Sequence, residues 1–131
     1  LLSFERGSLE IETKSGRHKF EIELALTSEQ QAQGVMYRQR MAGDAGMLFL
    51  YQSEQPLLMW MANTFIPLDM VFIGADGRIR NIAERTVPHS TATIASAGPA
   101  LAVLELNGGT AARLGIGVGD RVIYPAFAAK K

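Results

Sequence analysis

The residues that could do chemistry gather in one apolar run, Met59 to Ile73, which reads MWMANTFIPLDMVFI. The run contains a single carboxylate, Asp69, and two uncharged polar residues, Asn63 and Thr64. A strand buried on both faces is a nearly continuous series of aliphatic and aromatic residues. A carboxylate in such a strand costs free energy unless it is paired with a partner, protonated, or retained for binding or catalysis. We therefore expect Asp69 to be at least half buried, and to bind main-chain amides or Arg38.

A second carboxylate, Glu105, ends an apolar strand expected over 100–106. Because side chains alternate along a strand, Asp69 shares a face with Val71, and Glu105 shares a face with Val103. Both carboxylates could simply accept hydrogen bonds or pair with arginine. They could instead flank a sugar-like substrate as catalytic residues, with pKa values separated by burial and by each other. The sequence leaves the distance between them open.

Three further residues complete a candidate ligand-binding set. The Arg38 guanidinium could clamp an anion through two nitrogens, or brace a carboxylate. Asn63 lies where the chain bends towards Pro67, so it could bind a ligand or cap the backbone of the bend. Trp60 could form a wall. The predicted ligand-binding residues are Arg38, Trp60, Asn63, Asp69 and Glu105.

No metal or cofactor is expected. The chain has no cysteine, which excludes thiol chemistry, and its two histidines, His18 and His89, fall in a polar hairpin and a loop. Met59 and Met61 share one strand face and could bind copper(I) through their thioethers. Methionines at such spacing more commonly fill gaps in a core.

Composition narrows the class of partner. The chain has 131 residues, the size of one domain, with 13 basic and 13 acidic residues. A formal charge of zero argues against nucleic acid, which needs a basic face, and against a polybasic membrane anchor. The only long apolar stretch is interrupted by polar residues before it reaches the roughly 18 residues of a membrane span.

The hydrophobic pattern predicts mainly short strands. A capping box at Ser28 and Gln31 predicts a short helix that ends near Gly34, and Thr110 is expected to cap a single helical turn. The segment 88–99, rich in serine, threonine and alanine, is expected to be a loop. The predicted strands cover 9–14, 20–26, 46–51, 57–61, 68–73, 78–84, 100–106 and 121–124. This arrangement is typical of a mostly-β, single-domain antiparallel barrel or sandwich with two short helices.

Several segments resemble a known family. The matching motifs, in order, are GVMYR (34–38), GMLFLY (46–51), MWMANTFIPLDMVFI (59–73), VLELNGG (103–109) and GIGVGD (115–120). Together they resemble the bacterial and archaeal family Domain of Unknown Function 192, over about Leu9 to Tyr124. The family pattern is matched at Arg38, Trp60, Asn63, Thr64, Pro67, Asp69, Glu105 and Asp120.

The resemblance implies one mostly-β domain with small helices, often exported behind a signal peptide or lipid anchor, and it supplies no established activity. This chain departs from the pattern at Ala62, where lysine is usual, and at Thr93 and Ile94, where an aromatic residue is usual. Any function that needs the lysine is therefore in doubt here.

We expect one domain over 1–131, with a family-like core over about 9–124, in a periplasmic or exported protein. The function expected is binding of a small polar ligand or an envelope glycan, rather than catalysis. Two alternatives stay open, which are a hydrolase that uses Asp69 and Glu105, and a protein–protein adaptor without a small-molecule site.

Overall fold

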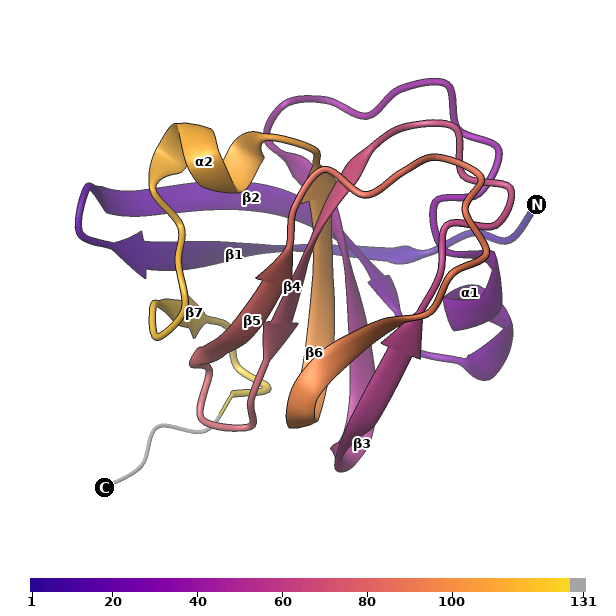
Figure 1. Ribbon diagram of the computed structural model, residues 1–131. Coiled ribbons are helices and arrows are strands. Elements are labelled where there is room, and N and C mark those ends of the chain that lie inside the picture. The colour runs from indigo at the N-terminus through magenta and orange to yellow at the C-terminus, as the bar shows by residue number, and fades with distance from the viewer. Residues whose placement is uncertain (128–131) are drawn as a thin grey trace.

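Seven strands form one curved, mostly antiparallel sheet in the computed structural model, which describes residues 1–127 (Figure 1). The strands are β1 (Glu5–Thr13), β2 (Gly16–Ala25), β3 (Ala45–Met59), β4 (Leu68–Ile73), β5 (Ile79–Ala83), β6 (Ile94–Asn107) and β7 (Arg121–Ile123). The helices are α1 (Ser28–Gln33) and α2 (Thr110–Leu114). The strand order is β5-β4-β6-β3-β2-β1-β7. The prediction of a mostly-β single domain with two short helices is confirmed.

One pair of neighbouring strands is parallel. β2 and β3 run side by side from the pair Glu21–Ala45 to the pair Ala25–Phe49. Parallel neighbours need a crossover connection, and α1 with the loop that follows it provides this connection. The purely antiparallel arrangement expected from the sequence is therefore modified at this one pair.

The sheet curls into a half-barrel whose end strands approach each other. Arg78 forms an isolated antiparallel bridge with Arg121. The Ile79 amide donates to the Asp120 carbonyl at 2.9 Å, and the Val122 amide donates to the Gly77 carbonyl at 2.8 Å. These contacts join the start of β5 to the region of β7 at one end of the half-barrel.

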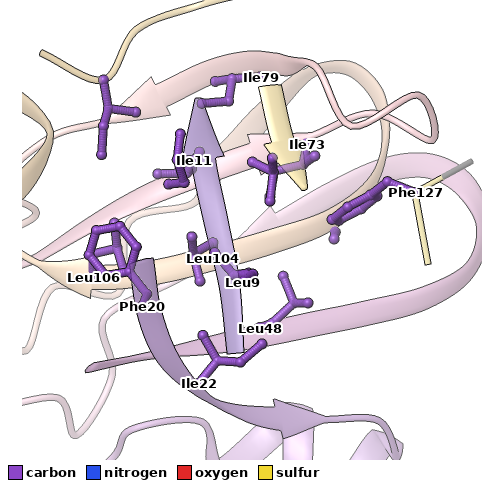
Figure 2. Packing of buried hydrophobic residues seen from close by; sticks show 14 of the residues in the cluster. Leu9, Ile11, Phe20, Ile22, Leu48, Ile73, Ile79, Leu104, Leu106 and Phe127 are labelled. Carbon is purple, nitrogen blue, oxygen red and sulfur yellow. The ribbon is translucent and has the colours of Figure 1, made fainter. Parts of the chain in front are cut away.

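Buried side chains divide into two clusters because alternate residues of a strand face opposite sides of the sheet. The inner cluster draws on all seven strands, and Figure 2 shows its side chains converging inside the half-barrel. The outer cluster lies on the other face of β3, β4 and β6, where Met47, Met70 and Val103 alternate with inner residues. Its buried members are Ala25, Val35, Met47, Phe49, Leu57, Met61, Leu68, Met70, Phe72, Ala100 and Val103.

Two strands are longer than expected. β3 joins the strand predicted over 46–51 to the first three residues of the strand predicted over 57–61, with bulges that interrupt its register with β6. The expected strand at Trp60 and Met61 is wrong, because β3 ends at Met59. β6 begins at Ile94, inside the segment predicted to be a loop. The pairing Met59–Ile94 and the bond from the Leu57 amide to Ser96 Oγ, at 2.9 Å, extend the sheet into this weakly apolar segment.

Both helix caps lie one residue earlier than predicted. Thr27 caps α1, because its Oγ1 accepts from the Gln30 amide at 3.1 Å and Gln30 Oε1 accepts from the Thr27 amide at 3.2 Å. Gly109 precedes α2 with a φ of 93°, so Thr110 is the first helical residue and not the cap.

Candidate functional site

Glu105 lies on the central strand β6 with its carboxyl group in the outer cluster. In the sheet it is paired with Met47 of β3 and with Met70 of β4, and it is only 3% exposed. Among residues 1–127 its carboxyl group has no hydrogen-bond partner. Burial raises the pKa of Glu105 to about 8, although the positive charge of Arg38 opposes part of this rise. Glu105 is therefore a buried acid that holds its proton at neutral pH.

A cavity of about 200 Å³ opens beside Glu105. Its lining residues come from α1 and the turn after it, from β3, from the segment around Trp60 and from β6: Gln31, Ala32, Gln33, Val35, Met36, Phe49, Tyr51, Leu58, Met59, Trp60, Thr64 and Glu105. Trp60 is 54% exposed, so part of its indole ring faces solvent. Burial raises the pKa of the Tyr51 hydroxyl, and the charge of Glu105 raises it further.

Gln31 fixes the helical wall of this cavity. Its Nε2 donates to the carbonyls of Ala25 at 3.1 Å and Leu50 at 3.0 Å, which ties α1 to β2 and β3. Both partners are acceptors, so the orientation of the amide is determined. Gln31 Oε1 accepts no hydrogen bond within the described part of the chain.

The loops next to the cavity hold three non-glycine residues in the left-handed region, where such residues are strained. These are Tyr37 (φ 68°), Asn63 (φ 54°) and His89 (φ 67°). The Tyr37 amide donates to the Asn63 carbonyl at 2.9 Å, and the His89 amide donates to the Thr64 carbonyl at 3.1 Å. The Phe65 ring lies 6.2 Å from the Tyr37 ring and 5.2 Å from the His89 ring. The strained turns therefore present a row of aromatic rings.

Asp69 is fully buried and binds three main-chain amides. Its Oδ1 accepts from Arg85 at 2.9 Å and Gly109 at 3.1 Å, and its Oδ2 accepts from Ala111 at 2.8 Å. The expectation that Asp69 is buried and bonded to amides is confirmed. These bonds join β4 to the start of α2 and to the loop after β5, and Asp69 does not line the cavity.

The register separates the two carboxylates. Asp69 pairs with Leu106 and belongs to the inner face, whereas Glu105 pairs with Met70 and belongs to the outer face. A two-carboxylate mechanism needs both groups on either side of one scissile bond. The arrangement expected for the hydrolase alternative is therefore absent, because the sheet lies between Asp69 and Glu105.

Arg38 and Asn63 lie outside the cavity lining. Arg38 forms an ion pair with Glu23 through both terminal nitrogens, and its Nη2 lies 3.2 Å from Glu23 Oε2. It therefore braces a carboxylate, one of the two roles considered for it, and it influences Glu105 only through its charge. Asn63 is exposed and uses its carbonyl in the bend.

The cavity thus contains Trp60 and Glu105 of the predicted set, together with residues that sequence reasoning missed. Tyr51 is the main omission. The available signal was that Tyr51 carries the only polar side chain in the strand GMLFLY and alternates in phase with Phe49. Gln31 was interpreted as part of a cap, although the cap residue is Gln30.

Metal-binding clusters and membrane-spanning helices are both absent from the described residues. Residues 1–127 contain no group of three or more histidine, aspartate or glutamate side chains placed to hold a metal ion. Neither α1 nor α2 is long enough or apolar enough to span a membrane.

Comparison with known proteins identifies the family. The family model of Domain of Unknown Function 192, described as Uncharacterized ACR, matches residues 10–124. A search of curated proteins found no match. A solved structure from Sinorhizobium meliloti, described as a "putative transcription regulator", is 47% identical with a TM-score of 0.92, and the match covers 96% of this chain and 98% of that chain.

A second solved structure, of a protein of unknown function from Novosphingobium aromaticivorans, is 46% identical with a TM-score of 0.90. That match covers 92% of this chain and 86% of the other. The family model covers nearly the whole chain, and its residues agree with the motifs that carried the resemblance. The chain therefore belongs to the family Domain of Unknown Function 192.

Proposed function

We propose that this protein is a binding module that holds a small polar ligand in the cavity at Glu105. One observation carries the proposal: a buried carboxyl group, without a hydrogen-bond partner among the described residues, lines a cavity that also has aromatic walls. The carboxyl oxygens are reachable from the cavity, because the unpaired side-chain atom found fully enclosed among the described residues is Arg80 Nε. A polar ligand in the cavity can therefore form hydrogen bonds with Glu105, and a concave pocket that holds a perturbed titratable group is typical of a binding site.

The size of the cavity limits the ligand. A volume of about 200 Å³ accommodates a small molecule, or one terminal unit of a polymer. Trp60 gives a flat apolar wall, and Glu105 and Gln31 give polar contacts at the same cavity. If the ligand is a polymer, it is an envelope glycan whose terminal sugar enters the cavity, and the protein is then exported to meet it.

Neither alternative from the sequence is favoured over binding. The hydrolase lacks a shared cleft for Asp69 and Glu105. The adaptor would need a flat exposed apolar patch. The exposed side chains of Leu58 and Trp60 belong to the cavity lining, so exposed Tyr37 and Phe65, which lie outside it, are the surface that an adaptor would use.

The description of the Sinorhizobium relative suggests gene regulation. This chain has a net charge of zero and helices of six and five residues. Binding of nucleic acid relies on a basic surface, and major-groove readers commonly use a longer recognition helix. Neither the net charge nor the helices of the described residues favour binding of nucleic acid by this chain.

The proposal is tested by titrating the protein with small amines, polyols and amino sugars while Trp60 emission and the melting temperature are recorded. Because a ligand that binds only the folded state stabilises it, a ligand at about 100 times its Kd should add about 2.7 kcal/mol of stability. The Trp60 emission should change at the same concentrations. Glu105→Gln should weaken binding, and Glu12→Gln, at an exposed position of β1, is the matched control. Binding that leaves Trp60 emission unchanged and is equal in both variants would contradict the proposal.

A further inference from the structure

We infer that the ligand of this cavity is an organic cation that carries a primary ammonium group, an inference that rests on the binding function proposed above. Among the residues that line the cavity, Glu105 is the only acidic or basic one. Its carboxyl group is almost completely buried and is free of hydrogen-bond partners in residues 1–127. The cavity therefore contains a buried acid next to space for a small molecule that could serve as its counter-ion.

Charge balance favours a cation over other ligands. A charged group out of water must be paired with an opposite charge. Arg38 is the nearby cation, but both of its terminal nitrogens are bonded to Glu23, and it does not line the cavity. Glu105 is neutral in the free protein at pH 7, and an ammonium group in the cavity would displace its proton and become the counter-ion of the carboxylate. An anion would be repelled by ionised Glu105, and a neutral ligand would leave Glu105 protonated.

The other walls suit an ammonium group. Phe49, Tyr51 and Trp60 line the cavity, and aromatic rings attract cations that approach their faces. Gln31 Oε1 is left as an acceptor, because Gln31 Nε2 is committed to two main-chain carbonyls. A primary ammonium group has three N–H donors, which can be matched by Glu105, Gln31 Oε1 and the Tyr51 hydroxyl oxygen.

Not every polar group in the lining discriminates between ligands. The Gln33 amide and the Trp60 indole N–H are donors that would serve neutral ligands as well. Thr64 Oγ1 already donates to the Ala62 carbonyl at 3.1 Å and keeps only its capacity to accept. The selectivity for a cation therefore depends on Glu105.

Proton release should accompany the binding of a cation. Two titratable or charged groups interact electrostatically with Glu105, namely Tyr51 from β3 and Arg38 from the turn after α1. Arg38 is itself paired with Glu23 of β2. The residues paired with Glu105 in the sheet, Met47 and Met70, are uncharged. Because burial raises the pKa of Glu105 to about 8, the carboxyl group is protonated in the free protein at pH 7. Ionisation on binding should then release about 0.9 proton at pH 7. The affinity should rise about tenfold between pH 6 and pH 7 and level off above pH 8.

The experiment uses n-butylammonium chloride and butan-1-ol, which share an alkyl chain and differ in the charge of the head group. Isothermal titration calorimetry of the full chain is done from pH 6 to pH 9, in buffers of different ionisation enthalpy, so that proton release is measured directly. We expect butylammonium to bind more tightly than butanol, with the pH dependence given above. In Glu105→Gln both the tight binding and the pH dependence should disappear, whereas Glu12→Gln should behave like the parent protein.

Different failures have different meanings. Tighter binding of butanol or of N-acetylglucosamine, with an affinity that falls above pH 8, would overturn the cation inference and leave the proposed binding function intact. Equal butylammonium affinity in the parent and in Glu105→Gln would overturn the inference by showing that the cation binds elsewhere. If none of the three probes shows Glu105-dependent binding, both the inference and the proposed function are wrong.

Discussion

Asp69 and Glu105 face opposite sides of the sheet although their strands are hydrogen-bonded neighbours. Asp69 lies opposite Leu106, and Glu105 lies opposite Met70. Directly opposed residues project from the same face of a sheet, so an offset of one residue separates the two carboxylates. Asp69 is directed to the start of α2, where it binds amides, and Glu105 is directed to the cavity. The first carboxylate holds the fold together, and the second is available to a ligand.

Replacing Asp69 by asparagine should destabilise the protein. The substitution removes the charge from a carboxylate that accepts three main-chain hydrogen bonds, and it turns one acceptor into a donor facing buried amides. We expect the free energy of unfolding to fall by about 1–3 kcal/mol, measured by urea denaturation. Asp44→Asn changes an exposed aspartate in the same way and is the control. Equal losses in the two variants would show that the amide cluster contributes little.

Glu105 should make the stability of the protein depend on pH. Its pKa is about 8 in the folded chain and near 4.5 when unperturbed. Between these values the folded state holds a proton that the unfolded state has released, so stability falls as pH rises, by up to about 1.4 kcal/mol per pH unit. The contribution is complete below pH 4.5 and lost above pH 8.

Glu105→Gln cannot ionise and should lack this component of the pH dependence. The free energy of unfolding of the variant, relative to that of the parent protein, should therefore increase as pH rises from 5 to 8. The difference between the two free energies should be constant above that range. Denaturation curves at each pH measure the difference directly, because the other titrating groups are common to both proteins. Parallel stability profiles would mean that Glu105 titrates normally.

The local pattern of apolar and polar residues in the sequence was sufficient to predict the burial of Asp69, the face of Glu105 and the kinds of secondary structure. The apolar run around Asp69 predicted its burial, because a charge in such a strand needs partners wherever the strand lies. Alternation also placed Glu105 on the same face as Val103, as observed for the outer cluster. The predictions for mostly-β structure and two short helices followed from periodicity and turn residues.

The remaining features depend on contacts between distant parts of the chain. The one-residue offset between Asp69 and Glu105 is set by the pairing of β4 with β6, which no local pattern encodes. Arg38 was expected to reach Asp69 or a ligand, but the parallel pairing of β2 with β3 places Glu23 beside it. The cavity was not predictable for the same reason, since its lining combines α1, β3 and β6.

A methyl group on Gly46 should disturb the pairing that positions Glu105. A Cβ atom there would lie 2.8 Å from Leu106 Cδ2 and 2.9 Å from the Glu105 carbonyl oxygen, too close for either to remain in place. Overpacking of this kind costs about 1–3 kcal/mol, so Gly46→Ala should lower the denaturation midpoint. A Cβ atom on Gly43 would meet nothing within 4 Å, which makes Gly43→Ala the matched control. A Gly46→Ala midpoint equal to that of the control would contradict close packing of β3 on β6.

Removing the charge of Arg38 should raise the pKa of Glu105 further. Arg38 is the group that lowers this pKa against the effect of burial, and it does so from an ion pair with Glu23 that is itself largely buried, with the two side chains 27% and 23% exposed. In Arg38→Gln the negative form of Glu105 loses this stabilisation, so its carboxyl carbon should titrate at a higher pH in a ¹³C NMR experiment. Arg17→Gln, which removes a guanidinium from an exposed ion pair on β2, should leave the titration unchanged. An unchanged or lower midpoint in Arg38→Gln would show that Glu23 already cancels the field of Arg38 at the cavity, and that burial alone determines the protonation of Glu105.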